Sequence, residues 1–179
     1  VPIAPIGMTG DAVTILGHAD GWKPLYAFVP TTSVSIGQSN HAASGPNLLT
    51  ITLSMNLDLA PGSKVTLSGL TGTSTGDNSN LGIMTSNGAF GTSGVWTKST
   101  GELVLTVASG GYSTNGEIVI TVQLVNGPVA QGPRTVTCGY ELGYLGGSEM
   151  LRVDGVTADG DDILEVFVMS SSSSSSSSS

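Results

Sequence analysis

The chain has 179 residues, of which 10% are charged, and 13 Asp and Glu against 5 Lys and Arg give a formal net charge of −8. So few cations exclude the phosphate neutralisation that nucleic-acid binders need and the polybasic patch that binds anionic membranes, so we expect neither partner. Hydrophobic residues make up 39% of the chain, which excludes the composition of a disordered protein.

The first 30 residues predict an extended N-terminal arm. Two prolines in Val1–Ile6 fix φ and restrict the residues before them, which favours extended backbone. Ala12–Leu16 and Leu25–Val29 have the apolar character of short strands. An apolar arm is hard to leave in water, so we expect residues 1–30 to pack on their own domain or on a neighbouring subunit.

Residues 31–140 predict a β-sandwich core. Leu49–Leu57 alternates apolar side chains with Thr, Ser and Asn, which gives a strand one apolar and one uncharged polar face. Lys64–Ser68, Leu103–Val107 and Ile118–Leu124 share most of this pattern. Further strands are expected at Thr32–Gln38, Val95–Trp96 and Arg134–Tyr140. Short strands with Gly, Pro and Asn between them predict an all-β antiparallel sandwich with almost no helix.

Two connections interrupt these strands in different ways. Ala60–Ser63 predicts a tight turn, because Pro presets φ and Gly tolerates positive φ. Thr71–Ser93 is a broad polar stretch, which we interpret as a long loop. A loop of that length in a small domain is usually functional or ordered by a partner.

The C-terminal residues differ in character from the core. We assign 141–169 to C-terminal strands, the last of which, Ile163–Met169, is apolar on both faces and so needs cover on both. Residues 170–179 are all Ser. This polyserine tail is either a flexible linker or a stand-in for residues of unassigned identity.

Cys138 is the chain's single cysteine. Its place beside Val136 in a strand favours a buried thiol. The alternative is an intermolecular disulfide, and the sequence leaves both interpretations open.

No set of residues predicts catalysis or metal binding. Asp159–Asp162 and Asp77–Asn80 offer oxygens but lack the full calcium loop, so we interpret both as polar turns. His18 and His41 have no metal-ligand spacing, and no strained Ser turn of the G-x-S-x-G type occurs. We therefore expect no enzyme, no catalytic, metal or cofactor-binding residues, and no cofactor.

Glycans enter the prediction in two ways. No N-x-[ST] sequon occurs, whereas hydroxyls near Pro30 and in the tail are candidate O-glycosylation sites: Thr31, Thr32, Ser170 and Ser171. The aromatic residues could stack on sugars, although packing in the core is the favoured interpretation; they are Trp22, Trp96, Tyr112, Tyr140 and Tyr144.

A family resemblance covers a little over half of the chain. Its pieces are Thr32–Ile36, Leu59–Thr73, Phe90–Trp96 and Val122–Gln131. These segments resemble repeat units of large extracellular surface and appendage (mastigoneme-like) proteins of algae and other protists. The resemblance implies an immunoglobulin-like sandwich, here with extended N- and C-terminal strand segments, and no catalytic residues.

These observations lead us to expect an extracellular or cell-surface structural subunit. It would form a homo-oligomer or filament of identical subunits by strand exchange or edge packing, with Val1–Val29 or Ile163–Met169 completing a neighbour's sheet. The alternatives are an adhesin or carbohydrate-binding module that uses Thr71–Ser93, and a viral capsid-type sandwich.

Overall fold

The computed structural model describes residues 32–111, 116–142 and 151–168. These residues form nine strands and no helix, which confirms the all-β expectation for the described part of the chain. The strands are β1 (Thr32–Gln38), β2 (Pro46–Met55), β3 (Lys64–Ser68), β4 (Asn78–Thr85), β5 (Ser93–Thr97), β6 (Glu102–Thr106), β7 (Ile118–Val125), β8 (Thr137–Leu142) and β9 (Leu151–Thr157). In the described residues, no helix is therefore available that is long and apolar enough to cross a membrane.

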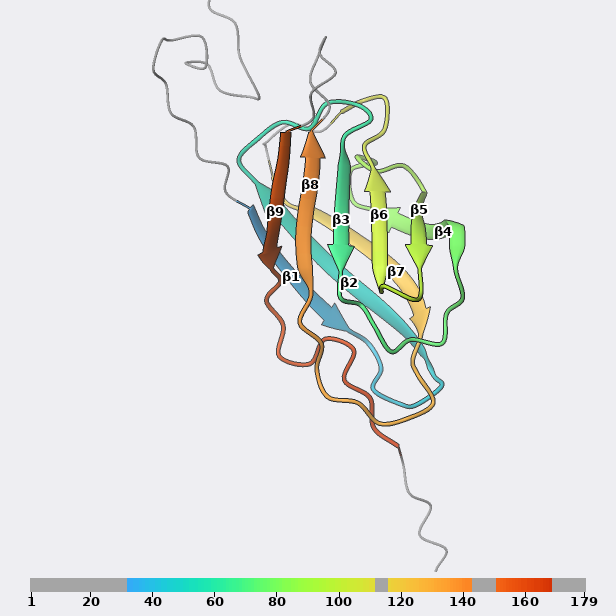
Figure 1. Ribbon diagram of the computed structural model, residues 1–179. Helices are drawn as coiled ribbons and strands as arrows, with labels where there is room; N and C mark the ends of the chain where they lie inside the picture. The colour runs from blue at the N-terminus through green and yellow to red at the C-terminus, as the bar shows by residue number, and fades with distance from the viewer. Residues whose placement is uncertain (1–31, 112–115, 143–150, 169–179) are drawn as a thin grey trace, which may run out of the picture.

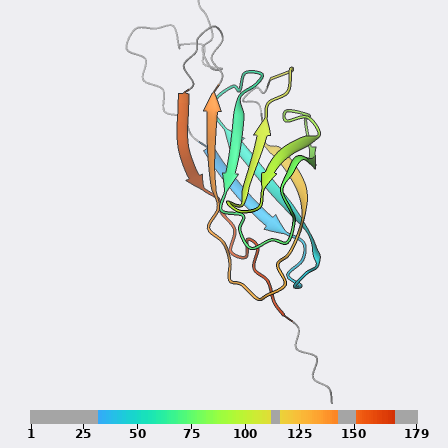
Figure 2. The same cartoon turned by 45° about the vertical axis from the view of Figure 1, so that its right-hand side comes forward.

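All strand pairs are antiparallel, and together they form one sheet in the order β1-β2-β7-β4-β5-β6-β3-β8-β9. The sheet folds back on itself, so that β5, β6, β3, β8 and β9 lie in front of β1, β2 and β7 (Figure 1). The turned view in Figure 2 shows the same two layers, with the strands of the rear layer crossing those of the front layer obliquely.

Strand β4 turns the corner between the two layers. Its first part pairs with β5, its second part pairs with β7, and the register shifts between Asn78 and Leu81. Such a bulge bends a strand and increases its twist, which lets one strand belong to both layers.

The opposite side of the sheet is closed by the C-terminal segment. After β9 the chain runs beside β1, where Ile36 N donates to Asp159 O at 2.8 Å and Asp159 N donates to Val34 O at 2.8 Å. The sheet is thereby nearly closed into a barrel.

The core lies between the layers and is filled by alternate residues of each strand. In β2 the inward positions are buried and the outward positions are exposed or half-buried, as strand geometry requires. Trp96 and Tyr140 are the largest fully buried side chains. They pack with a cluster of aliphatic residues that includes Leu49, Ile51, Leu53, Leu67, Leu103, Leu105, Ile118, Ile120 and Leu124.

Two sequence expectations are wrong. The stretch Thr71–Ser93 is not one long loop, because it contains β4, whose inward Leu81 and Ile83 are buried. Residues 163–168, the described part of the expected strand Ile163–Met169, are not a strand: residues 161–164 form a bend and turn, and Val166 and Phe167 make isolated bridges. Leu164, with φ 53°, has a backbone conformation that no strand adopts.

The expected domain boundaries divide what the structure joins in one sheet. Strand β8 spans the boundary between 31–140 and 141–169, and β9 pairs with it. The N-terminal arm, residues 1–30, and the tail, residues 170–179, lie outside the described residues.

Candidate functional site

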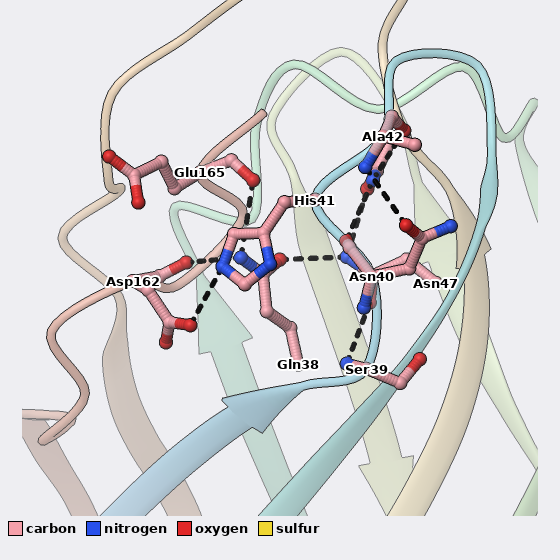
Figure 3. Close-up of polar contacts among 9 residues, drawn as sticks. Gln38, Ser39, Asn40, His41, Ala42, Asn47, Asp162 and Glu165 are labelled. Carbon is pink, nitrogen blue, oxygen red and sulfur yellow. Dashed lines mark hydrogen bonds and ion pairs between the residues drawn. The ribbon is translucent and has the colours of Figure 1, made fainter. Parts of the chain in front are cut away.

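Buried polar groups gather at one end of the sheet, where the loop after β1 meets the start of β2 and the end of β7 (Figure 3). Asn47 and Asn126 are 0% and 1% exposed, and Asn47 Nδ2 donates to Asn126 Oδ1 at 2.9 Å. Asn47 and Asn126 fall in step with the alternate, inward-facing residues of β2 and β7, so each amide points into the core. A buried amide is tolerated only when its hydrogen-bonding groups have partners.

The two amides satisfy the backbone of the loop that follows β1. Asn47 Oδ1 accepts from Ser39 N at 3.1 Å and from Asn40 N at 3.3 Å. Asn126 Nδ2 donates to Asn40 O at 2.9 Å and to Ala42 O at 3.0 Å. The amide pair therefore fixes the shape of this loop.

The C-terminal segment Ala158–Phe167, which we call the strap, is attached to that loop. Phe167 N donates to His41 O at 2.8 Å and Ala43 N donates to Phe167 O at 3.1 Å. Val166 and Gln131 exchange two backbone hydrogen bonds, of 2.9 and 3.0 Å. Ile163 and Leu164 of the strap are buried in the core. Backbone pairing and apolar burial together hold the strap on the sheet.

Side chains from two other elements bind the strap's turn. Gln38 Nε2 donates to Asp162 O at 2.6 Å and to Glu165 O at 3.2 Å (Figure 3). Gln131 Nε2 donates to Leu164 O at 2.6 Å. These amides satisfy the carbonyl groups that the turn leaves without strand partners.

Among the described residues, His41 and Asp162 form a pair that resembles part of a catalytic arrangement. Nε2 of His41 lies 2.9 Å from Asp162 Oδ2, and the His41 ring stacks on Phe167 with 5.6 Å between centroids. A His–Asp pair performs nucleophilic catalysis only with a nucleophile on its other side. Ser39 is nearby in sequence, but its Oγ accepts from Leu48 N at 2.8 Å. The geometry supports a role for the pair in joining the strap to the loop.

The structure places several of the sequence-predicted site residues. Cys138 is a free cysteine that is fully buried on β8, and desolvation raises its pKa from 9.0 to about 12. A disulfide to another chain would require β8 to leave the core. Thr32 is half-buried, and its Oγ1 donates to Tyr140 Oη at 3.1 Å. Thr31, Ser170 and Ser171 lie outside the described residues.

The structure also describes the two acidic turns and some of the aromatic residues. Asp77 Oδ1 accepts from Lys98 N at 2.7 Å, and Asp159 belongs to the strap. Within the described ranges no group of three or more His, Cys, Asp or Glu could hold a metal ion. Trp96 is 1% exposed and donates from Nε1 to Thr75 O at 3.2 Å, so it offers no ring face to a sugar. His18, Trp22, Tyr112 and Tyr144 are outside the described residues.

A second candidate is the outward surface of β1, β2, β7 and β4, which we call the uncharged face. Its side chains include no Asp, Glu, Lys or Arg, because these four strands contain none. The face consists of Ser33, Ser35, Gly37, Pro46, Leu48, Thr50, Thr52, Ser54, Gly82, Met84, Val119, Thr121, Gln123 and Val125. The other layer differs, since Lys64, Glu102 and Glu141 lie on β3, β6 and β8.

Sequence reasoning missed the amide pair, although a signal was present. Asn47 has the parity of the buried Leu49 and Ile51, and Asn126 has that of Ile120 and Val122. Parity alone marks both amides as inward-facing at the ends of core strands.

In comparisons with known proteins, no family model matches the chain and no curated protein matches it. The interpretation of both surfaces therefore depends on their own geometry.

Proposed function

We propose that this protein is an extracellular structural subunit that assembles with identical copies into a filament, appendage or surface coat. The strands in two layers support an immunoglobulin-like arrangement of the sandwich, as in the repeat units that the sequence resembles. The polar groups that the sheet end brings together are used to hold the chain's own loop and strap, which favours a structural over a chemical role.

The observation that carries this proposal is that the outer edge of β1 is already in use. Val34 O and Ile36 N, which point away from β2, are bonded to Asp159. A strand that precedes β1 and turns back tightly along it would need the same two groups. The apolar segments of Val1–Val29 therefore need cover elsewhere. Because β1 is occupied in the same way in every copy, the neighbouring subunit would supply this cover by strand addition at β9, the other end strand of the sheet.

The strap is a weaker candidate for such an exchange. Ile163, Leu164 and Val166 are each at most 1% exposed within their own chain. Removing them would uncover the core that they fill. We therefore assign strand exchange to Val1–Val29, with edge packing as the second contribution to assembly.

Truncation of residues 1–30 tests this function. We expect the full chain to form large assemblies, visible by negative-stain electron microscopy and sedimentation velocity, and the truncated chain to remain a small folded species. Circular dichroism of the truncated chain provides the control for folding. A full chain that stays monomeric at every concentration would contradict the proposal.

A further inference from the structure

We propose that the uncharged face is the surface through which two copies of this chain pack side by side. The inference rests on the proposed function, because it names the lateral contact between neighbouring subunits. The face lies on β1, β2, β4 and β7, so the inference is independent of the N-terminal arm.

Electrostatic repulsion between two copies is smaller when they meet through the uncharged face than when they meet through the front layer. Each copy has a formal net charge of −8, so two copies repel each other wherever their carboxylates meet. The front layer would bring Glu102 and Glu141 of both copies together, with Lys64 as the one cation on β3, β6 and β8. The uncharged face brings together no charged side chains across its four strands. Depletion of charge at the centre is also the composition of protein interfaces.

Large apolar side chains are exposed on the same face. Leu48, Met84 and Val125 are 44%, 75% and 36% exposed. They lie on three adjacent strands, since β2 and β4 both pair with β7. Exposed apolar side chains gathered on one face mark a contact surface more than isolated ones do.

Hydroxyl groups on the same face suit a contact with an identical surface. Thr50 lies opposite Thr121, and Ser35 lies opposite Thr52. A hydroxyl both donates and accepts, so two copies related by a two-fold axis can pair hydroxyl with hydroxyl without a mismatch. Ammonium and carboxylate groups cannot pair with their own kind in this way.

The size of the face indicates a weak contact that needs repetition. Four strands spaced by about 4.8 Å, each with about seven residues of 3.3 Å, cover roughly 400 Å² per copy. A standard stable interface buries about 800 Å² per partner. One such contact suits a lattice, in which many copies act together, better than an isolated dimer.

The margin of the face sets where the contact is centred. The strap's Asp159 is exposed and pairs with Ser35, which places this carboxylate at the β1 margin. Two copies avoid apposing these carboxylates when the contact is centred on β2 and β7. Thr50 and Thr121 lie at that centre.

A charge-swap experiment on the full chain tests the contact. Thr50→Glu and Thr50→Lys each place a charge at the centre of the face, and each variant alone should lose at least tenfold in self-association by sedimentation velocity. An equimolar mixture of the two should recover it, because the opposite charges then meet. Thr121→Glu and Thr121→Lys on the neighbouring strand should give the same pattern. Circular dichroism checks that the variants are folded.

The matched control is Thr106→Glu, an exposed Thr on β6 in the other layer. It should leave self-association unchanged. Assembly that survives in all four face variants but is reduced by Thr106→Glu would overturn the proposed contact and leave the structural function intact. A wild-type chain that never self-associates would overturn both.

Discussion

The buried amides Asn47 and Asn126 are the residues on which the end of the sheet depends. Each lies in a position that an apolar side chain would occupy by parity, yet each has partners for its carbonyl and its NH2 group. A fully satisfied buried network specifies one arrangement of the chain, whereas a partly satisfied one is strongly destabilising. The amide pair therefore holds the loop after β1 in the shape that bonds to the strap.

Asn47→Ala should therefore destabilise the protein by roughly 3 kcal/mol, because it leaves the buried Asn126 Oδ1 without its donor and removes the acceptor of Asn40 N. Urea denaturation followed by intrinsic fluorescence measures the change at constant m-value. Gln123→Ala, an exposed amide on β7, is the matched control and should change the free energy of unfolding by less than about 0.5 kcal/mol. Equal effects of the two substitutions would mean that burial of Asn47 is unimportant.

Cys138 gives the molecule a specific response to alkaline pH. Burial raises its pKa from 9.0 to about 12, so above pH 9 the unfolded chain loses the thiol proton while the folded chain keeps it. The unfolded state then binds fewer protons, and the free energy of unfolding falls as pH rises between these two values, by about 1.4 kcal/mol per pH unit. Below pH 9 the contribution is constant.

The variant Cys138→Ala should lose this component of the alkaline slope. Unfolding curves of both proteins between pH 8 and 11 measure the difference, which cancels the titration of Lys and Tyr residues. The thiol should also react slowly with Ellman's reagent until the protein is unfolded. A native thiol that reacts at once, or equal slopes in both proteins, would contradict burial as the cause.

The strap covers the outer edge of β1, the first strand of the sheet. An exposed edge of β1 would be a template for uncontrolled pairing with other chains, and the strap removes this hazard by bonding to Val34 and Ile36. Its path requires Gly160, whose φ is 154°. A Cβ there would overlap Ile36 O.

Gly160→Ala should displace the strap from β1 and destabilise the protein by roughly 2 kcal/mol. Hydrogen exchange should then become faster at the amides of Asp159 and Ile36, which bond across this contact. Gly82→Ala is the control, because a Cβ at Gly82 meets nothing within 4 Å. Unchanged exchange at both amides in Gly160→Ala would show that the strap does not depend on this glycine.

The whole molecule has two unlike surfaces in a chain of net charge −8. Lys64, Glu102 and Glu141 lie in the front layer, while the uncharged face covers the rear layer. Repulsion between copies then comes from the loops and the front layer, and the attraction comes from uncharged groups. Salt weakens the first and leaves the second nearly unchanged.

Self-association should therefore strengthen as NaCl is raised from about 20 to about 300 mM, since the Debye length shortens from roughly 20 Å to below 10 Å. Sedimentation velocity across this range measures the effect. Assembly that weakens with salt would indicate attraction between opposite charges and would direct attention to the front layer.

The sequence by itself determined the class of the fold and much of its surface. Alternation of apolar and hydroxyl side chains is a local property of a strand, so β2, β3, β6 and β7 could be predicted with their inward faces. The absence of charge from the outward positions of β1, β2, β4 and β7 is likewise a property of the sequence. The neighbours of Cys138 and Trp96 favoured a place in the core for both, but for Cys138 the sequence also left an intermolecular disulfide open.

Only the tertiary structure decided which segments meet. The pattern in Ile163–Met169 is typical of a strand, but Ile163 and Leu164 lie in a turn and are buried in the core. Within Thr71–Ser93 the polar residues conceal β4, whose two halves pair with β5 and β7. The amide pair joins residues 79 positions apart in the chain. The local alternation of residues determines which way each side chain of a strand points. Which distant segments pair depends on the backbone N–H and C=O groups that are left without partners once adjacent strands have bonded.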